Sequence, residues 1–549
     1  MRRIPDRIVR LFGFAVLFAA TSWGQTLKFN PPAVPAGIII DRLEDTTALV
    51  GDLVLTSPGG LLGVTNATVT ITLNQPVTSQ VLTIGSATLS DALLNLTDTT
   101  TPASSAVYAG SIKGSVITFS GVAIPAGDNY TITFQNVRVN ANAAANNFVV
   151  TESVFIGSQG FVNYTTATPV QVGLVEQGFS VPGLTAGTTP LSYTTCVGNP
   201  TTSIDGTPNT YSFQITVKEL FNAAFKTKTT AGTCGGISPC QVTAAEQGSN
   251  TTSTTVVQGT NALIGQATHG TRFQLSFANV PQNVTIYLPL TLTNMGGTLV
   301  LTLTGSATGI ISPVSASTPA GWLGAPSAPY TSNGNGTVNA YYEVTTADNT
   351  VSNLSFNAFG YITAPAAFTA SATSPITVTI TPAPTAGSGV TDIPSFGASS
   401  NPTVTLGSFA LCQTVLLFPY VSNETGFDTG IAISNTGVDP LGKAGAQGGS
   451  GGTCTLNFYG VGAPVPSVAV PPPPPFPAVL QPGTASAFLL SSVAIGFQGY
   501  IIAQCNFLYA HGFAYLSYYP GRVSLPYLAE VIPTGPAGRA TTTFESLGH

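Results

Sequence analysis

Two groups of carboxylates have the residue types of a metal site. The first group consists of Asp41, Glu44, Asp45 and Asp52, and the second consists of Glu424, Asp428 and Asp439. Calcium takes about six to eight oxygen ligands and accepts loop carbonyls beside carboxylates, so each group is a candidate calcium site. Neither has the regular spacing of a known calcium loop. The alternative is a set of solvated turns, with an ion pair to Arg42 in the first group. No other cofactor is predicted.

Two of the six cysteines share the alternating pattern of buried strand residues. Cys454 is in phase with Leu456, and Cys505 is in phase with Ala503, so both thiols are expected to face a core. We predict that they pair as a disulfide between adjacent or facing strands. A bridge between positions this far apart contributes roughly 3 to 4 kcal/mol, because it restricts the unfolded chain.

The remaining cysteines are less constrained. Cys234 and Cys240 lie in the turn-rich segment CGGISPC and form the second predicted pair. The partners of Cys196 and Cys412 stay open, because the middle and C-terminal groups each hold an odd number of cysteines. Each group either keeps a free thiol or shares one bridge with the other. Disulfides are preferred to metal ligation because the chain begins like an exported protein.

Histidines are few, which restricts the enzyme chemistry open to the chain. His269, His511 and His549 are the three present. His511 continues the alternating phase of Phe507 and Tyr509, so it is either a buried acid or base or an aromatic-packed residue at a strand edge. In an aromatic environment its neutral imidazole is expected, because desolvation disfavours the charged form.

Two motif matches fail on their context. Residues 448–452 (GGSGG) satisfy G-x-S-x-G, but that motif needs a strand, a strained turn and a helix around the serine. Residues 437–444 (GVDPLGKA) resemble a phosphate-binding loop, but they lack its hydroxyl residue and the helix that follows. Because no activated nucleophile, metal triad or phosphate loop emerges, the sequence predicts no catalytic residue and no enzyme activity.

The elements that position these residues are strands. Apolar residues alternate with Thr, Ser, Asn or Gln in residues 67–74, 211–217, 284–292 and 376–380. This pattern is typical of antiparallel strands with one face in a core and the other in water. With dense Gly and Pro turns between short strands, it predicts an all-β fold of several antiparallel β-sandwich domains in tandem, immunoglobulin-like in architecture.

Two segments depart from the simple alternation. In residues 129–139 the apolar phase shifts by one position, which predicts a β-bulge near Gln135 or Asn136. Helical periodicity is limited to residues 219–226 (ELFNAAFK), where one or two helical turns are expected.

Composition shifts divide the chain. A linker is predicted at residues 383–402, because Pro, Gly and Ser occur there without alternation. The full division is a signal peptide (1–24), a β-sandwich domain (25–178), a region of one elaborated or two small sandwiches (179–382), the linker (383–402), a C-terminal β-sandwich (403–533) and a tail (534–549).

The N-terminus predicts export. A basic stretch over residues 1–10 precedes an apolar run over residues 11–20, and the small residues Ser22 and Gly24 place cleavage after Gly24. The apolar run is shorter than the roughly 20 residues of a spanning helix. We therefore expect a secreted or cell-surface, extracytoplasmic protein with no membrane span in the mature chain.

Charge is scarce. Only 7% of residues are Asp, Glu, Lys or Arg, and the formal net charge is −6, whereas about 25% are charged in ordinary globular chains. An acidic, lysine-poor surface argues against nucleic acid as a partner. Low charge density also weakens the usual barrier to self-association.

Part of the C-terminal region resembles known proteins, and the resemblance rests on residues 416–440, 452–460 and 496–517. The segments LLFPYVSNETGFDTGIAISNTGVDP, GTCTLNFYG and GFQGYIIAQCNFLYAHGFAYLS are similar to a module of uncharacterised exported multi-domain β-sandwich proteins of soil bacteria. The resemblance implies export and a sandwich architecture. It implies no activity and no catalytic residue.

Two functions follow from these expectations. The first is an exported cell-surface or extracellular-matrix protein with a structural or adhesive role, whose partner is an unknown surface or matrix component, a second copy of itself, or glycans. The alternative is a carbohydrate-binding protein or glycoside-active enzyme. Trp322, the one tryptophan beyond the predicted signal peptide, is then the expected sugar-stacking residue.

Overall fold

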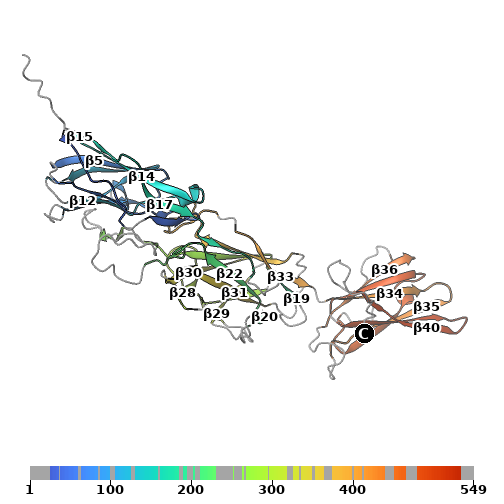
Figure 1. Ribbon diagram of the computed structural model, residues 1–549. Coiled ribbons are helices and arrows are strands. Elements are labelled where there is room, and N and C mark those ends of the chain that lie inside the picture. The colour runs from blue at the N-terminus through green and yellow to red at the C-terminus, as the bar shows by residue number, and fades with distance from the viewer. Residues whose placement is uncertain are drawn as a thin grey trace, which may run out of the picture.

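The computed structural model shows three β-sheet bodies in a row along the chain (Figure 1). The predicted signal peptide and the predicted tail lie outside the described residues. The structure describes residues 25–532 except for 36–37, 60–62, 85–86, 99–104, 125, 127–129, 159–160, 185–189, 195–201, 204–209, 230–245, 247–250, 253–262, 265–266, 283, 295, 318–325, 333–335, 349–350, 352, 364–373, 399–400, 411–412, 439–450, 465–478 and 508.

The first body is a sandwich of two sheets with one core. One sheet runs in the order β10 (Ser111–Lys113), β11 (Val116–Ile124), β5 (Val64–Leu73), β14 (Phe148–Gly157), β17 (Val170–Glu176) and β2 (Ile39–Arg42), with β16 (Tyr164–Thr165) beside β14. The facing sheet runs β4 (Leu53–Thr56), β12 (Tyr130–Gln135), β8 (Leu93–Asp98) and β9 (Ala106–Ala109). Short ladders pair β1 (Gln25–Thr26) with β15 (Phe161–Val162), β3 (Ala48–Leu49) with β13 (Arg138–Val139), and β6 (Val81–Ile84) with β7 (Ala87–Ser90).

The middle body is one elaborated sandwich, because both of its sheets enclose a single core. One sheet runs β18 (Phe179–Ser180), β22 (Phe213–Glu219), β31 (Ser355–Thr363), β26 (Thr285–Pro289) and β29 (Ser327–Thr331). The other runs β19 (Leu191–Thr194), β33 (Val404–Ala410), β32 (Ile376–Ala383), β25 (Arg272–Ala278), β30 (Thr337–Ala347), β28 (Leu299–Thr304) and β27 (Thr291–Thr293). Two small ladders join β20 (Thr202–Ser203) to β21 (Thr210–Tyr211), and β23 (Thr251–Thr252) to β24 (Leu263–Ile264).

The third body is a smaller sandwich with its own core. One sheet runs β36 (Cys454–Val461), β38 (Gln498–Cys505), β34 (Thr414–Ser422) and β41 (Glu530–Ile532). The other runs β37 (Thr484–Leu489), β35 (Phe427–Asn435), β39 (Ala510–Tyr518) and β40 (Val523–Leu528). The predicted all-β fold of tandem, mainly antiparallel sandwiches is confirmed. The pairs β1–β15, β2–β17 and β19–β33 are parallel.

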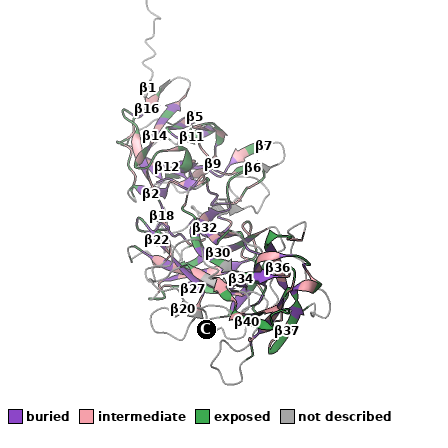
Figure 2. Cartoon of the chain, turned by 90° about the vertical axis from the view of Figure 1, so that its right-hand side faces the viewer, coloured by how far each residue is buried: buried purple, intermediate pink, exposed green. Residues whose placement is uncertain are grey.

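Alternation along the strands places the cores. In β5, Val69 and Ile71 are buried, while Thr68 and Thr72 are exposed, as expected for a strand with one wet face. Figure 2 shows the same division as buried and exposed strand residues within each body. Helical structure in the described residues consists of the 3₁₀ turns η2 (Ala141–Ala143) and η3 (Leu490–Ser492), and no described helix has the length and hydropathy to cross a bilayer.

Two local predictions are corrected by left-handed residues. The predicted helical turns at residues 219–226 are absent, and the segment is a turn in which Ala223 has a φ of 64°. The predicted bulge at Gln135 or Asn136 is a break between β12 and β13, where Asn136 has a φ of 57°. Asparagine tolerates this conformation better than most residues, and one residue outside the pleat explains the phase shift.

The predicted linker and the predicted start of the C-terminal domain at residue 403 are also corrected. Residues 404–410 form β33, which lies between β32 and β19 in the middle sandwich, so the C-terminal sandwich starts at Thr414 with β34. Residues 392–397, which we call the strap, pack between the first two bodies. Phe396 is fully buried and forms a bridge with Asp45. The Pro- and Gly-rich composition concealed this anchoring, because single buried residues do not produce an alternating pattern.

The disulfide between Cys454 and Cys505 is present, as predicted. The two cysteines are directly opposite each other on β36 and β38, and both are buried in the C-terminal core. They are separated by 51 positions, so the bridge restricts a long loop of the unfolded chain and contributes about 4 kcal/mol. The second predicted pair, Cys234 and Cys240, lies outside the described residues.

Candidate functional site

The first predicted calcium group lies where the first and middle bodies meet. The buried guanidinium of Arg42 donates hydrogen bonds to Asp45 at 2.9 Å and to Glu246 at 2.7 Å. It also donates to the carbonyl oxygen of Ala224 and to the hydroxyl of Thr271. Burial disfavours the charged guanidinium, but the charges of Glu246 and Asp45 outweigh this effect and raise the pKa of Arg42.

The predicted calcium site is corrected, because its four carboxylates take separate roles. Asp45 pairs with Arg42, which is the alternative that the sequence left open. Glu44 accepts the backbone N–H of Gly178 at 3.0 Å. Asp41 is buried at the same junction beside Lys226 of the middle body, and Asp52 is buried inside the first sandwich. Across the described part of the chain, no group of three or more His, Cys, Asp or Glu side chains could hold a metal ion.

The second carboxylate group is dispersed as well. Asp428 is buried and accepts hydrogen bonds from the side chain of Asn423 at 3.1 Å and from the hydroxyl of Ser491 at 2.6 Å, which fixes β35 against η3. Glu424 is exposed, and Asp439 lies outside the described residues. Asp428 therefore has a structural setting rather than that of a metal ligand.

Asp52 and Glu152 form a carboxyl pair inside the first sandwich that the sequence analysis missed. Burial raises the pKa of Asp52 to about 7 and that of Glu152 to about 8, where the charge of Asp52 adds to the effect. Neither oxygen of Glu152 has a hydrogen-bond partner among the described residues. The signal was available, because Glu152 occupies the inward phase of β14 between Val150 and Val154.

The structure places His511, one of the two other residues singled out in the sequence, but does not describe Trp322. His511 is half-buried on β39, where it lies opposite Ser434 of β35. This position is on the outer face of the sheet, beside the groove described next, and not in the core. Trp322, the predicted sugar-stacking residue, lies outside the described residues.

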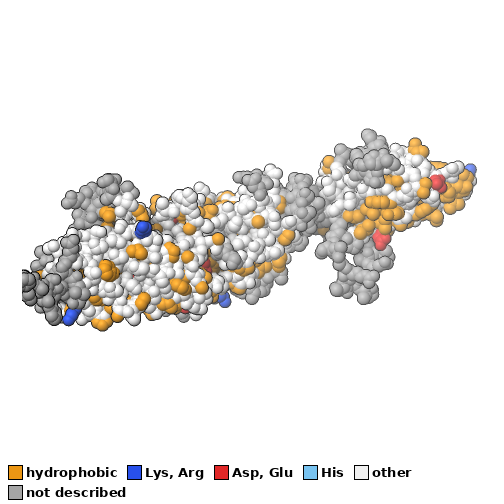
Figure 3. Space-filling view, turned by 90° about the horizontal axis from the view of Figure 1, so that it is seen from above, with side chains coloured by type: hydrophobic (Ala, Val, Ile, Leu, Met, Phe, Trp, Pro, Cys, Tyr) orange, Lys and Arg blue, Asp and Glu red, His pale blue; other side chains and the backbone are white. Residues whose placement is uncertain are grey.

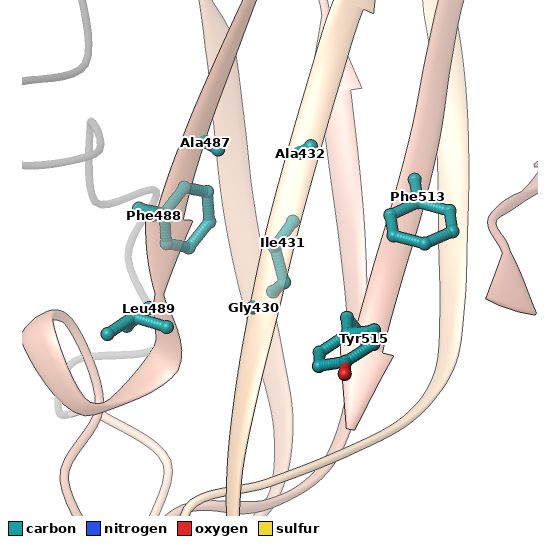
Figure 4. Close-up of a pocket in the computed structure, with 8 residues that line it drawn as sticks. All are labelled: Gly430, Ile431, Ala432, Ala487, Phe488, Leu489, Phe513 and Tyr515. Atoms are coloured by element: carbon teal, nitrogen blue, oxygen red, sulfur yellow. The ribbon is translucent and has the colours of Figure 1, made fainter. Parts of the chain in front are cut away.

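The outer face of β37, β35, β39 and β40 carries an apolar groove. Its volume is about 310 Å³, and Figure 4 shows its strands side by side. Gly430 and Ala432 of β35 form the floor, with Leu489 of β37 on one side and Phe513 and Tyr515 of β39 on the other. Ala487 and the buried residues Ile431 and Phe488 complete the lining.

The strand register explains the shape of this groove. Gly430 is directly opposite both Leu489 and Tyr515, so a row of large, small and large side chains crosses the sheet. The next outward row places Ala432 beside Phe513. Small residues on the central strand, with Leu489 on one side and Phe513 and Tyr515 on the other, produce a valley along β35.

A ridge runs beside the groove. It consists of Phe513, Tyr515 and Leu528, of which Leu528 is 73% exposed. Leu528 lies directly opposite Phe513 on β40. In Figure 3 the apolar side chains of the C-terminal sandwich gather into a patch larger than any other on the face shown. Contiguous exposed apolar surface of this kind marks interaction sites in soluble proteins.

The pattern of residues 510–518 contains the signal for this face. Gly512 and Ala514 are buried, whereas Phe513 and Tyr515 are exposed. A Cβ at Gly512 would lie 2.7 Å from the ring of Phe418, so the inner face is filled by a neighbour and admits only a small residue. When small residues alternate with aromatic ones along a strand in this way, the small residues face the core and the aromatic residues face outward.

The second sheet of this body exposes an aromatic pair. Tyr459 and Tyr500 are opposite each other on β36 and β38, and their rings stack with centroids 5.0 Å apart. Nearby, the amide of Gln498 donates a hydrogen bond to the hydroxyl of Tyr420 at 2.9 Å. An exposed aromatic face beside an amide and a hydroxyl has the chemistry for stacking a flat ligand.

No family model matches the chain, and no curated protein matches it.

Proposed function

We propose that this chain is an exported cell-surface or extracellular-matrix structural protein without catalytic activity, which assembles with copies of itself through the groove and ridge of its C-terminal sandwich. The observation that carries the proposal is the juxtaposition of the Gly430–Ala432 floor with the exposed ridge on one sheet face.

A second copy is the occupant that this geometry favours. Groove and ridge lie side by side on one face, so a two-fold axis between two such faces places each ridge in the opposite groove, as in an isologous dimer. The lining is almost entirely apolar, so it has few polar groups with which to select a charged or sugar ligand. The low charge of the chain, at 7%, adds little repulsion between copies.

Filling the groove is expected to weaken self-association. A Cβ at Gly430 would meet Leu489 and Tyr515 at 3.9 Å, an ordinary contact distance, so the sheet accepts a Cβ here and the methyl groups of Gly430→Val would occupy the floor. We expect at least a tenfold higher dissociation constant, equivalent to about 1.4 kcal/mol. Sedimentation velocity of the mature chain over a concentration series measures this.

The matched control is Val461→Ser. Val461 is 72% exposed at the end of β36, in the other sheet. Replacing its apolar side chain should therefore leave self-association unchanged. A wild-type chain that stays monomeric at every concentration, or a Gly430→Val chain that associates as well as wild type, contradicts the proposal.

A second candidate, glycan binding, is favoured by the Tyr459–Tyr500 stack. We expect binding on a glycan array that is lost in Tyr500→Ala, because the stacked pair then lacks one face. Tyr519→Ala is the control, since Tyr519 is exposed beyond the end of β39. Absence of wild-type binding to every glycan tested removes this candidate and leaves the groove proposal intact.

A further inference from the structure

The junction between the first and middle bodies contains a buried amine and a buried acid that the proposed function does not use. Lys226 belongs to the middle body and is 4% exposed, while Asp41 lies on β2 of the first body and has no exposed surface. The Nζ of Lys226 is 4.0 Å from Oδ1 of Asp41. Both groups therefore lie together in a site that excludes water.

The acid lacks the partners that a buried carboxylate normally requires. Neither oxygen of Asp41 accepts a hydrogen bond from any described residue, although most buried polar atoms are paired. Burial raises the pKa of Asp41 to about 7, against the opposing charge of Lys226, and the charge of Asp45 adds to the rise. A large share of Asp41 is therefore the neutral acid near neutral pH.

The amine is held in place by its backbone. The N–H of Lys226 donates to the hydroxyl of Thr271 at 2.9 Å, and the N–H of Thr271 donates to the carbonyl oxygen of Lys226 at 2.8 Å. Thr271 also receives a hydrogen bond from Arg42 of the first body. These bonds fix the base of the lysine side chain, so its flexible stem has only a short distance left to cover.

We infer that Lys226 and Asp41 are joined by an intramolecular amide bond that links the first and middle bodies covalently. The ammonium of Lys226 passes a proton to the carboxylate of Asp41, the amine so formed attacks Cγ of the protonated acid, and the Nζ–Cγ bond forms. One Cγ–Oδ bond breaks, and the departing hydroxyl takes a proton from the nitrogen and leaves as water. No oxidant, reductant or other reactant is consumed.

Two physical effects favour this condensation. In water an acid and an amine ionise and do not condense, whereas burial opposes the charged form of the acid. Holding the two groups together also removes the loss of translational and rotational entropy that a bimolecular reaction would have to overcome. The amide leaves no buried charge on either group, which removes the desolvation penalty of an ion pair.

The mass of the purified, reduced mature chain tests the bond directly. We expect the denatured protein to be one water lighter than its sequence predicts. Trypsin does not cleave after an acylated lysine, so the digest should contain residues 29–42 joined to residues 219–228 in one branched peptide. The branched peptide locates the lost water at this pair and distinguishes it from dehydration elsewhere in the chain.

Lys226→Arg is the matched variant, because it keeps the positive charge and cannot form the amide. Its mass should equal the mass of its sequence, and the branched peptide should be absent. A wild-type digest that yields free residues 29–42 and 219–226, with no branched peptide, overturns the inference. That result would leave the self-association proposal untouched, since the two rest on different bodies.

Discussion

Replacing Arg42 by methionine is expected to lower the free energy of unfolding of the joined first and middle bodies by about 3 to 5 kcal/mol. Arg42 is the shared partner of Asp45 and Glu246, and both carboxylates stay buried when it is removed. Methionine preserves much of the packing of the stem over Phe396, whose ring centroid is 5.1 Å from the guanidinium carbon. The decrease in the free energy of unfolding therefore measures the cost of leaving the carboxylates of Asp45 and Glu246 buried without their partner.

Urea unfolding followed by circular dichroism measures this change. Arg522→Met is the matched control, because Arg522 is exposed in the turn between β39 and β40, and its replacement should shift stability by less than about 0.5 kcal/mol. An Arg42→Met protein as stable as this control would show that the buried network contributes nothing to the junction.

Raising the pH from 5 to 8 is expected to destabilise the first sandwich. The pKa values of Asp52 and Glu152 lie at about 7 and about 8 because both groups are buried, whereas carboxyls in the unfolded chain have pKa values of about 4. Between about pH 4 and pH 8 the folded state thus binds more protons than the unfolded chain. The stability from the neutral acids is complete below pH 4 and is lost as the pH rises through 7 to 8.

The expected loss is on the order of 7 kcal/mol, since about two pH units for Asp52 and three for Glu152 lie between pH 5 and their pKa values, and each unit corresponds to about 1.4 kcal/mol. Thermal unfolding at a series of pH values measures it. Glu152→Gln removes one titrating group of the same shape, so its stability should depend less on pH and exceed that of wild type at pH 8. A wild-type protein that is more stable at pH 8 than at pH 5 contradicts the burial of these acids.

Period-two alternation predicted most of the fold because it records which face of a strand meets a core. It placed Cys454 and Cys505 in one core, and the disulfide followed from their phase. Where one residue leaves the pleat, as at Asn136, alternation reports only that the phase changes. A strand break at Asn136 and a β-bulge at the same position therefore give the same sequence pattern.

The candidate sites were harder to predict, because they depend on contacts between distant segments. The pairing of Arg42 with Glu246 joins positions 204 residues apart, and nothing local marks Glu246 as its partner. The groove depends on register across β37, β35 and β39, which places Gly430 between Leu489 and Tyr515. Alternation gives the face of each residue but not its neighbour on the next strand.

The strap has a mechanical consequence. Ser395 exchanges hydrogen bonds with Thr46 and Thr47 of the first body, while Ile393 accepts one from Thr268 of the middle body. Tension entering from the C-terminal sandwich reaches β33 first, and β33 is hydrogen-bonded to a strand on each side. A force along the chain therefore first loads the hydrogen bonds of an interior strand and of the strap, in addition to the contacts of Arg42 across the junction.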